Sequence, residues 1–206
     1  MKSTMHAGTE GRSRLLVAVV FFVFFVISFL TNILGPLIPD IIADFHVSLT
    51  MAAILPFAFF IAYGVMSIPA GFAVQRWGEK KPMVASFVAA TLGATSFAAF
   101  PSYSMAVTSL FVIGAGMAVL QVAIKPLLRV AGGEEHFAFN SAFAQLIFGA
   151  ASFVSPLVYS DLVRLLDPAH RDLKGLYAVL GRITTPALPW ASIYWIFALV
   201  SGLAWR

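Results

Sequence analysis

Long, largely uncharged hydrophobic stretches alternate with short polar segments along the whole chain. Six stretches are expected to cross a bilayer, because about 20 apolar residues are needed to span its hydrocarbon core. They cover residues 15–39, 49–74, 82–100, 104–128, 137–163 and 188–206, approximately. The pattern therefore predicts an all-α membrane protein with six transmembrane helices, preceded by a short polar segment at residues 1–14.

Basic residues fall in alternate connecting segments, as the positive-inside rule requires of cytoplasmic loops. They precede the first span (Lys2, Arg12, Arg14), join the second to the third (Arg76, Lys80, Lys81) and follow the fourth (Arg129). Residues 1–14 and the C-terminus are thus both expected in the cytoplasm, and a bacterial inner membrane is the expected location. Residues 161–189 are also basic and violate the rule mildly; residues 173–180 within them are expected to form an interfacial helix.

Composition excludes several classes of protein. With 60% hydrophobic and 11% charged residues, the chain has too little polar surface for a water-soluble globule of its size. The net charge of +4 does not indicate nucleic-acid binding, because the basic residues lie between apolar runs. The absence of Cys excludes disulfides and thiolate catalysis. No nucleophile, phosphate-loop or metal-binding motif is present, and consecutive Glu134, Glu135 and His136 do not suit a metal ion. We therefore expect neither an enzyme nor a cofactor.

The run from Gly71 to Lys81, GFAVQRWGEKK, joins the second and third spans. It resembles the loop signature of the major facilitator superfamily. Gly71 and Gly78 are expected to permit a tight loop and close helix approach, and Arg76, Lys80 and Lys81 to anchor the loop at an anionic membrane surface. Gln75 stands where the family usually has an acid, which removes a charge relay. An ordinary basic cytoplasmic loop remains the alternative reading.

Three further segments resemble the fucose/galactose/hexose permease family: TNILGP at 31–36, LQVAIKP at 120–126, and FAFNSA at 137–142 followed by FGA at 148–150. This resemblance implies a twelve-span fold built from two six-span halves, of which the chain corresponds to the N-terminal half. Each half consists of two inverted three-helix repeats. In the family, acids in spans one and four serve sugar binding and proton coupling. Here Asn32 and Gln121 occupy these positions, and neither amide titrates.

Two helical faces carry small and polar residues. In span four they are Gly114, Ala118, Gln121 and Lys125, and in span five they are Ser141, Gln145, Gly149, Ser152 and Pro156. The small residues are expected to pack helices together. The amides have more hydrogen-bonding capacity to satisfy and are expected to line a cavity. The proposed substrate-binding residues are Asn32, Gln121, Gln145, Tyr63 and Asn140. Lys125 either snorkels to the headgroups or points inward as a coupling candidate.

These features favour a transmembrane carrier for a small-molecule sugar that works by alternating access. Bends at Gly35-Pro36, Pro56 and Pro69 are expected to supply hinges. A carrier of this kind needs a second half, either the missing C-terminal half or a second copy of the chain. The chain is therefore expected to be a half-length fragment that is inactive alone. The alternative is a membrane scaffold or assembly subunit without a transported substrate.

Overall fold

The structure is a computed structural model that describes residues 3–166, 179–180, 184 and 188–204. All regular elements within these residues are helices, which confirms the predicted all-α class. The long helices are α1 (Ser3–Asn32), α2 (Leu34–Phe45), α3 (Leu49–Trp77), α4 (Lys80–Ala99), α5 (Tyr103–Gly132) and α6 (Phe137–Leu165). The last described segment comprises the 3-10 turn η1 (Pro189–Ala191) and α8 (Ser192–Ala204).

The first hydrophobic stretch forms two helices, α1 and α2, separated at Ile33. Pro36 causes this interruption, because it lacks the N–H that would bond to the carbonyl of Asn32. Hydrogen bonds from Ile33 N to Phe29 O and from Leu37 N to Ile33 O keep the two helices nearly continuous. By contrast, α3 runs without interruption through Pro56 and Pro69.

The α2 helix continues through Pro39 to Phe45, beyond the end expected for the first span. Asp40 and Asp44 consequently lie on a helix and not in a connecting loop. Their side chains bond to other helices: Tyr159 donates to Asp40, and Trp190 Nε1 donates to Asp44 at 2.5 Å. These partners explain how two acids are accommodated at the end of a hydrophobic helix.

Local signals define several helix ends. Ser48 and Ser102 are N-caps, and their hydroxyls accept hydrogen bonds from Met51 N and Met105 N, each at 3.3 Å. At its other end α3 stops at Gly78, whose φ of 73° and ψ of 175° are nearly restricted to glycine.

Five helical segments in the described part of the chain are long and apolar enough to cross a membrane. They are residues Leu15–Phe45, taken as one unit, together with α3, α4, α5 and α6. The α8 helix has 13 residues and rises only about 20 Å, less than the roughly 30 Å of a bilayer core. The interfacial helix expected at 173–180 lies largely outside the described residues.

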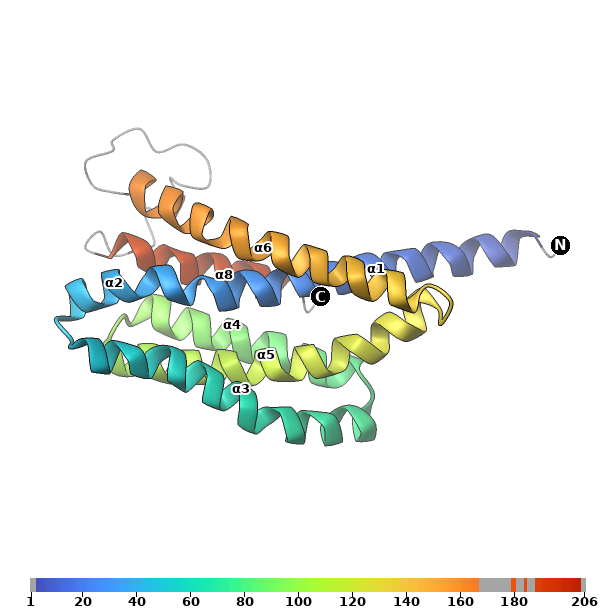
Figure 1. Cartoon of the computed structure of the whole chain (residues 1–206), viewed down its shortest axis with the longest axis horizontal. Helices are drawn as coiled ribbons and strands as arrows, with labels where there is room; N and C mark the ends of the chain where they lie inside the picture. The colour runs from blue at the N-terminus through green and yellow to red at the C-terminus, as the bar shows by residue number, and fades with distance from the viewer. Residues whose placement is uncertain (1–2, 167–178, 181–183, 185–187, 205–206) are drawn as a thin grey trace.

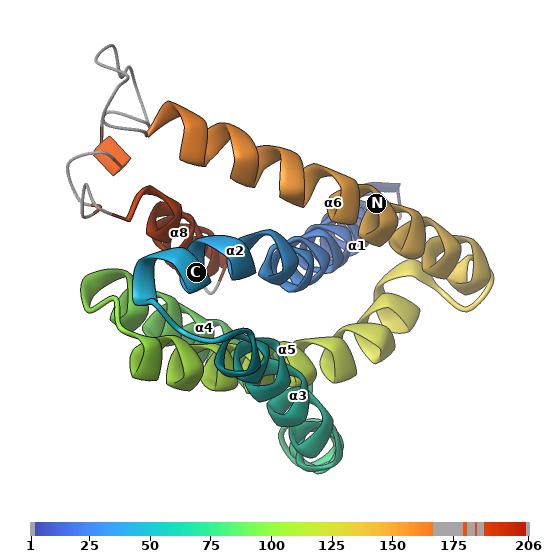
Figure 2. The same ribbon diagram turned by 60° about the vertical axis from the view of Figure 1, so that its left-hand side comes forward.

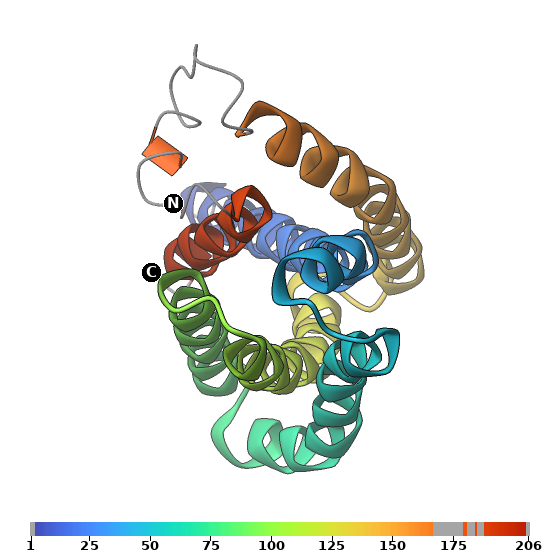
Figure 3. The ribbon, with the colours of Figure 1, turned by 90° about the vertical axis from the view of Figure 1, so that its left-hand side faces the viewer.

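The helices form two units of three, α1/α2–α3–α4 and α5–α6–α8. The first helix of each unit packs on the second helix of the other, as α1 on α6 and α5 on α3, and the third helices α4 and α8 pack together. Figures 2 and 3 show α1, α2 and α8 between α6 on one side and α3, α4 and α5 on the other. Because three successive crossings reverse direction, the second unit is inverted relative to the first.

Close packing joins α5 to its neighbours. A Cβ added at Gly114 would lie 2.3 Å from the carbonyl oxygen of Phe59, and one at Gly116 would lie 3.0 Å from that of Ser86. Gly114 therefore has the packing role expected for the small residues of this face. Gly149 does not, because nothing lies within 4 Å of its added Cβ.

An aromatic cluster fills the space between α4, η1 and α8. Trp190 and Tyr194 are 2% and 1% exposed, and the rings of Phe97 and Tyr194 lie 4.5 Å apart. Both residues lie near the start of the predicted span 188–206, a position where Trp and Tyr often sit at the membrane interface. Their burial shows that they are core residues, since the end of this span packs against α4.

Candidate functional site

A small polar cleft lies where α1, α5 and α6 meet. Its volume is about 80 Å³, enough for several water molecules. Lys125 from α5 and Ser141 and Gln145 from α6 supply its polar groups, and Phe24, Leu128 and Phe137 complete the lining. Tertiary packing thus brings together two residues that the sequence singled out on different helices, Lys125 and Gln145. Lys125 lines this cleft with an exposed side chain, so both orientations expected for it, toward the headgroups and inward, stay open.

Polar groups continue from this cleft along one face of α1. Phe24, Ser28 and Asn32 are four residues apart and therefore lie one above another. Ser28 Oγ donates to the carbonyl oxygen of Phe148 on α6 at 2.5 Å. Asn32 Nδ2 donates to the carbonyl oxygen of Ser28 at 2.8 Å.

These hydrogen bonds fix Asn32 next to the part of α6 that follows Gln145. The side chain of Asn32 is half-buried, and its Oδ1 has no hydrogen-bond partner among the described residues. This oxygen can accept a hydrogen bond from a hydroxyl group. We call Ser28, Asn32, Lys125, Ser141 and Gln145 the polar strip.

Gln121 lies one helical turn from Lys125 on the same face of α5. Its side chain is half-buried, and within the described residues its amide has no hydrogen-bond partner. Further along this face, Ala118 and Gly114 are buried. The face therefore changes from close helix packing at Gly114 to an open polar cleft at Lys125, with Gln121 between them.

Two other candidate residues lie apart from the polar strip. Tyr63 on α3 stacks on Phe59, with ring centroids 6.3 Å apart. Asn140 lies against the α5 terminus, where a Cβ added at Gly132 would be 2.3 Å from its Nδ2. Neither residue lines the cleft of Lys125 and Gln145.

Sequence reasoning did not identify Ser28 or Ser155 as links between α1 and α6. Ser155 is fully buried, and its hydroxyl donates to the carbonyl oxygen of Phe29 at 2.8 Å. For Ser28 the sequence does offer a signal, because Ser28 and Asn32 are four residues apart and share one face of α1. Ser155 offered none, because a serine in a hydrophobic helix more often bonds within its own helix.

The loop between α3 and α4 is exposed over most of its length. Gln75, Arg76, Gly78, Lys80 and Lys81 are all exposed, and the Arg76 guanidinium lies 5.9 Å from the ring centroid of Trp77. Gly78 provides the backbone conformation that the tight turn needs. The close approach expected at Gly71 is wrong, because a Cβ added there would have no atom within 4 Å.

Glu134, Glu135 and His136, between α5 and α6, are all exposed. Glu134 pairs with Arg129 at 2.9 Å, with both side chains largely exposed. Over the described ranges no group of three His, Cys, Asp or Glu side chains is close enough to hold an ion.

The sequence profile of the major facilitator superfamily matches residues 20–205. The chain is 30% identical over 143 residues to the glucose/galactose transporter of Brucella abortus biovar 1 (strain 9-941), covering 68% of the chain and 35% of that protein. It is 29% identical over 154 residues to the L-fucose-proton symporter of Escherichia coli (strain K12), covering 72% of the chain and 34% of the symporter.

Solved structures show the same fold. The crystal structure of the Escherichia coli fucose:proton symporter FucP matches with a TM-score of 0.68 and 21% identity, over 94% of the chain and 48% of the symporter. A structure of FucP in the outward conformation gives a TM-score of 0.69 and 22% identity, over 92% and 47%. The matched part is the N-terminal half of the symporter, which confirms the predicted fold. The chain thus spans about half the length of these structures and about a third of the curated relatives.

Proposed function

Because the chain belongs to the major facilitator superfamily, a family of membrane transporters and not of enzymes, we propose that it supplies one half of a carbohydrate carrier. Relatives named as glucose/galactose transporters and L-fucose-proton symporters support a sugar as the substrate. The single observation that carries the proposal is the polar strip, because it gathers amide, hydroxyl and ammonium groups where the hydrophobic helices α1, α5 and α6 meet, with Lys125 and Gln145 exposed.

The polar strip suits a sugar for chemical reasons. Each amide offers two donors and a carbonyl acceptor, which matches the mixed donor and acceptor character of sugar hydroxyls. Asn32, Gln121 and Gln145 are the residues that we propose bind the substrate. Tyr63 and Asn140 were expected to contribute, and their positions against Phe59 and Gly132 give them weaker support.

Transport by this mechanism requires a second helical unit. In alternating access, two halves rock around a site at their interface, and the cleft at Lys125 of about 80 Å³ supplies only one wall of such a site. We propose that the complementary half is a C-terminal six-helix unit or a second copy of the chain. The chain alone is expected to be inactive in transport.

Coupling to an ion would differ from an acid-based mechanism. Asn32 and Gln121 stand where the resemblance to the permease family places acids, and amides do not exchange protons in the physiological range. Lys125 is the charged side chain that lines the cleft, so we propose it as the coupling candidate.

The orientation follows from the ends of the bundle. The N-terminus, the α3–α4 loop and the α5–α6 loop lie at the same end in Figure 1. This end carries Arg76, Lys80, Lys81 and Arg129, whereas Asp40 and Asp44 lie toward the other. By the positive-inside rule we propose that the basic end is cytoplasmic, in a bacterial inner membrane.

Sugar uptake into proteoliposomes tests the proposal. The chain alone would be compared with the chain fused to the C-terminal half of the Brucella glucose/galactose transporter, using radiolabelled glucose, galactose and L-fucose. We expect uptake by the fusion only. Uptake by the isolated chain would show that the chain is active without a C-terminal half. A dimeric state of the active chain would then identify a second copy as the partner.

A membrane scaffold or assembly subunit remains the alternative function. A double variant in which Leu replaces both Asn32 and Gln121 distinguishes a carrier from a scaffold, since a scaffold needs only apolar packing at these positions. Loss of sugar uptake by the fusion, with its folding unchanged, would argue against a scaffold.

A further inference from the structure

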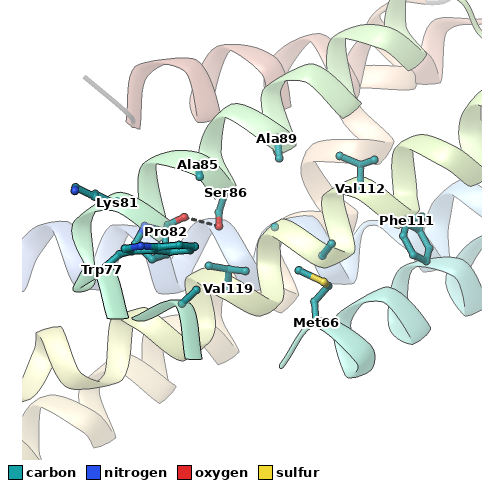
Figure 4. A pocket seen from close by; sticks show the side chains of 13 residues that line it. Met66, Trp77, Lys81, Pro82, Ala85, Ser86, Ala89, Phe111, Val112 and Val119 are labelled. Carbon is teal, nitrogen blue, oxygen red and sulfur yellow. Dashed lines mark hydrogen bonds between the residues drawn. The ribbon is translucent and has the colours of Figure 1, made fainter. Parts of the chain in front are cut away.

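An apolar cleft of about 540 Å³ lies between α3, α4 and α5, away from the polar strip. Met66, Ala85 and Phe111 contribute to its walls, and Trp77 and Lys81 lie at one end (Figure 4). A second cleft of about 530 Å³ also borders α3 and shares Met66 and Trp77 with the first. The half of α3 nearest the α3–α4 loop is thus bordered by apolar space.

The cleft results from how α5 contacts its two neighbours. Gly114 of α5 lies against the backbone of Phe59 in α3, and Gly116 lies against the carbonyl group of Ser86 in α4. Toward the α3–α4 loop, α3 diverges from α4 and α5, as Figures 1 and 3 show. Exposed side chains remain on this part of α3, including Ile68 and Phe72 at 71% and 69% exposure.

The wall of the cleft offers almost no hydrogen-bonding group. The hydroxyl of Ser86 already donates to the carbonyl oxygen of Pro82 at 2.8 Å, the dashed line in Figure 4. Apart from Lys81, the other residues that line the cleft are apolar. A sugar would lose its hydrogen bonds to water in such a space, whereas a hydrocarbon chain would not.

Positive charge gathers at one end of the cleft. Arg76, Lys80 and Lys81 are exposed there, against one acidic side chain, Glu79. Trp77 is 57% exposed beside them, and an amphipathic indole of this kind favours the level of the lipid headgroups. The cleft therefore combines an apolar groove with a basic, aromatic mouth.

The inverted repeat provides a counterpart of this cleft. Exchanging the two three-helix units converts α3, α4 and α5 into α6, α8 and α1, and these helices enclose a cleft of about 250 Å³. Phe25, Phe29, Val158 and Phe197 are among its lining residues, and none of the lining is charged. Among the described residues, Lys81 of the first cleft therefore has no charged equivalent in the lining of its counterpart.

We propose that the cleft between α3, α4 and α5 binds an anionic phospholipid, with one acyl chain in the groove and the phosphate at Lys81. From Lys81 to Ala89, α4 rises about 12 Å, close to the roughly 15 Å of one leaflet's hydrocarbon. Basic pockets between transmembrane helices on the cytoplasmic side suit anionic headgroups. This site is separate from the sugar site and does not depend on transport.

Native mass spectrometry of the purified chain in detergent tests the site. Phosphatidylglycerol and phosphatidylcholine with identical acyl chains would be supplied in equal amounts. We expect retained phosphatidylglycerol to exceed phosphatidylcholine by about five-fold, the effect of one basic residue near a headgroup. Lys81→Gln should abolish this preference and Lys81→Arg should preserve it, because Arg keeps the charge.

Two further variants separate the site from general surface charge. Arg129→Gln removes a cation from the same end of the bundle but outside the cleft, and should leave the preference intact. Ala85→Phe should fill the groove and lower retention of both lipids, with the melting temperature used to verify folding. Equal retention of both lipids by the unmodified chain, or an equal loss in Arg129→Gln and Lys81→Gln, overturns the proposal. So does a dimer that Ala85→Phe disrupts, since a second copy would then occupy the groove.

Discussion

Tyr159 on α6 donates its hydroxyl hydrogen to the carboxylate of Asp40 on α2, joining residues 119 positions apart in the sequence. A neighbouring bond from Trp190 Nε1 to Asp44 ties the same helix to η1. The end of the first hydrophobic segment is thus held against both the fifth and the last segments of the described chain.

Removing the tyrosine hydroxyl should weaken this junction. Tyr159→Phe leaves a half-buried carboxylate without its donor, and hydrogen bonds to charged groups contribute about 1.5–3 kcal/mol. We expect the free energy of unfolding in mixed detergent micelles to fall by about that amount. Tyr103→Phe is the matched control, because Tyr103 bonds to Met51 O at an exposed position and its loss should cost less. Equal effects of the two variants would contradict a special role for the Asp40 contact.

Gly114 and Gly149 should respond in opposite ways to Ala. A Cβ at Gly114 would collide with the backbone of Phe59, so Gly114→Ala should destabilise the protein by about 1–3 kcal/mol. A Cβ at Gly149 has nothing within 4 Å, so Gly149→Ala should stabilise its helix by up to about 1 kcal/mol. Thermal unfolding in detergent measures both. A stable Gly114→Ala protein would mean that α3 and α5 are less closely packed than the structure has them.

Gly78 and Gly71 form a second contrasting pair. Gly78→Ala places a side chain at φ of +73°, which should cost roughly 1–3 kcal/mol and disturb the α3–α4 turn. Gly71 lies within α3 in open surroundings, and Gly71→Ala should be neutral or mildly stabilising. Limited proteolysis at the loop provides the readout, with faster cleavage expected only for Gly78→Ala.

The polar strip should carry sugar recognition in a reconstituted carrier. A double variant in which Leu replaces both Asn32 and Gln145 lacks two amides. The loss of two hydrogen bonds should weaken sugar binding by about ten-fold. A rise in the KM for uptake by the fusion with the Brucella C-terminal half would report this. Tyr63→Phe should have a smaller effect, since Tyr63 stacks on Phe59 outside the cleft. If Tyr63→Phe is the more damaging change, the binding site lies nearer α3 than we propose.

The natural absence of Cys allows a direct test of orientation. Single cysteines would replace Leu49, which is 73% exposed at the start of α3, and the exposed Glu135 between α5 and α6. In intact cells, a membrane-impermeant maleimide should label Leu49→Cys, whereas Glu135→Cys should react only after lysis. The reverse pattern would invert the proposed topology.

Much of the fold follows from the sequence because hydrophobic length is a local property. A run of apolar residues must form a helix in lipid, where every backbone group needs an internal partner. Helices α3, α4, α5 and α6 therefore begin and end within a few residues of the expected spans. The side chains of Lys125 and Gln145 were also recognisable, because polar groups are rare in such helices and need a reason to be there.

Contacts between distant segments could not be read from the order of the residues. The sequence shows an acid at position 40 and a tyrosine at position 159. It does not show that α2 continues through Pro39 and brings Asp40 and Tyr159 together. The same limit applies to Trp190. Its position near a span end favours the membrane interface, but the packing of α8 on α4 buries it. The order of the amino acids is enough to locate the membrane helices and their polar residues, since both depend on the local cost of placing backbone and side chains in lipid. The structure decided which helices meet, because that depends on how the shapes of their faces fit.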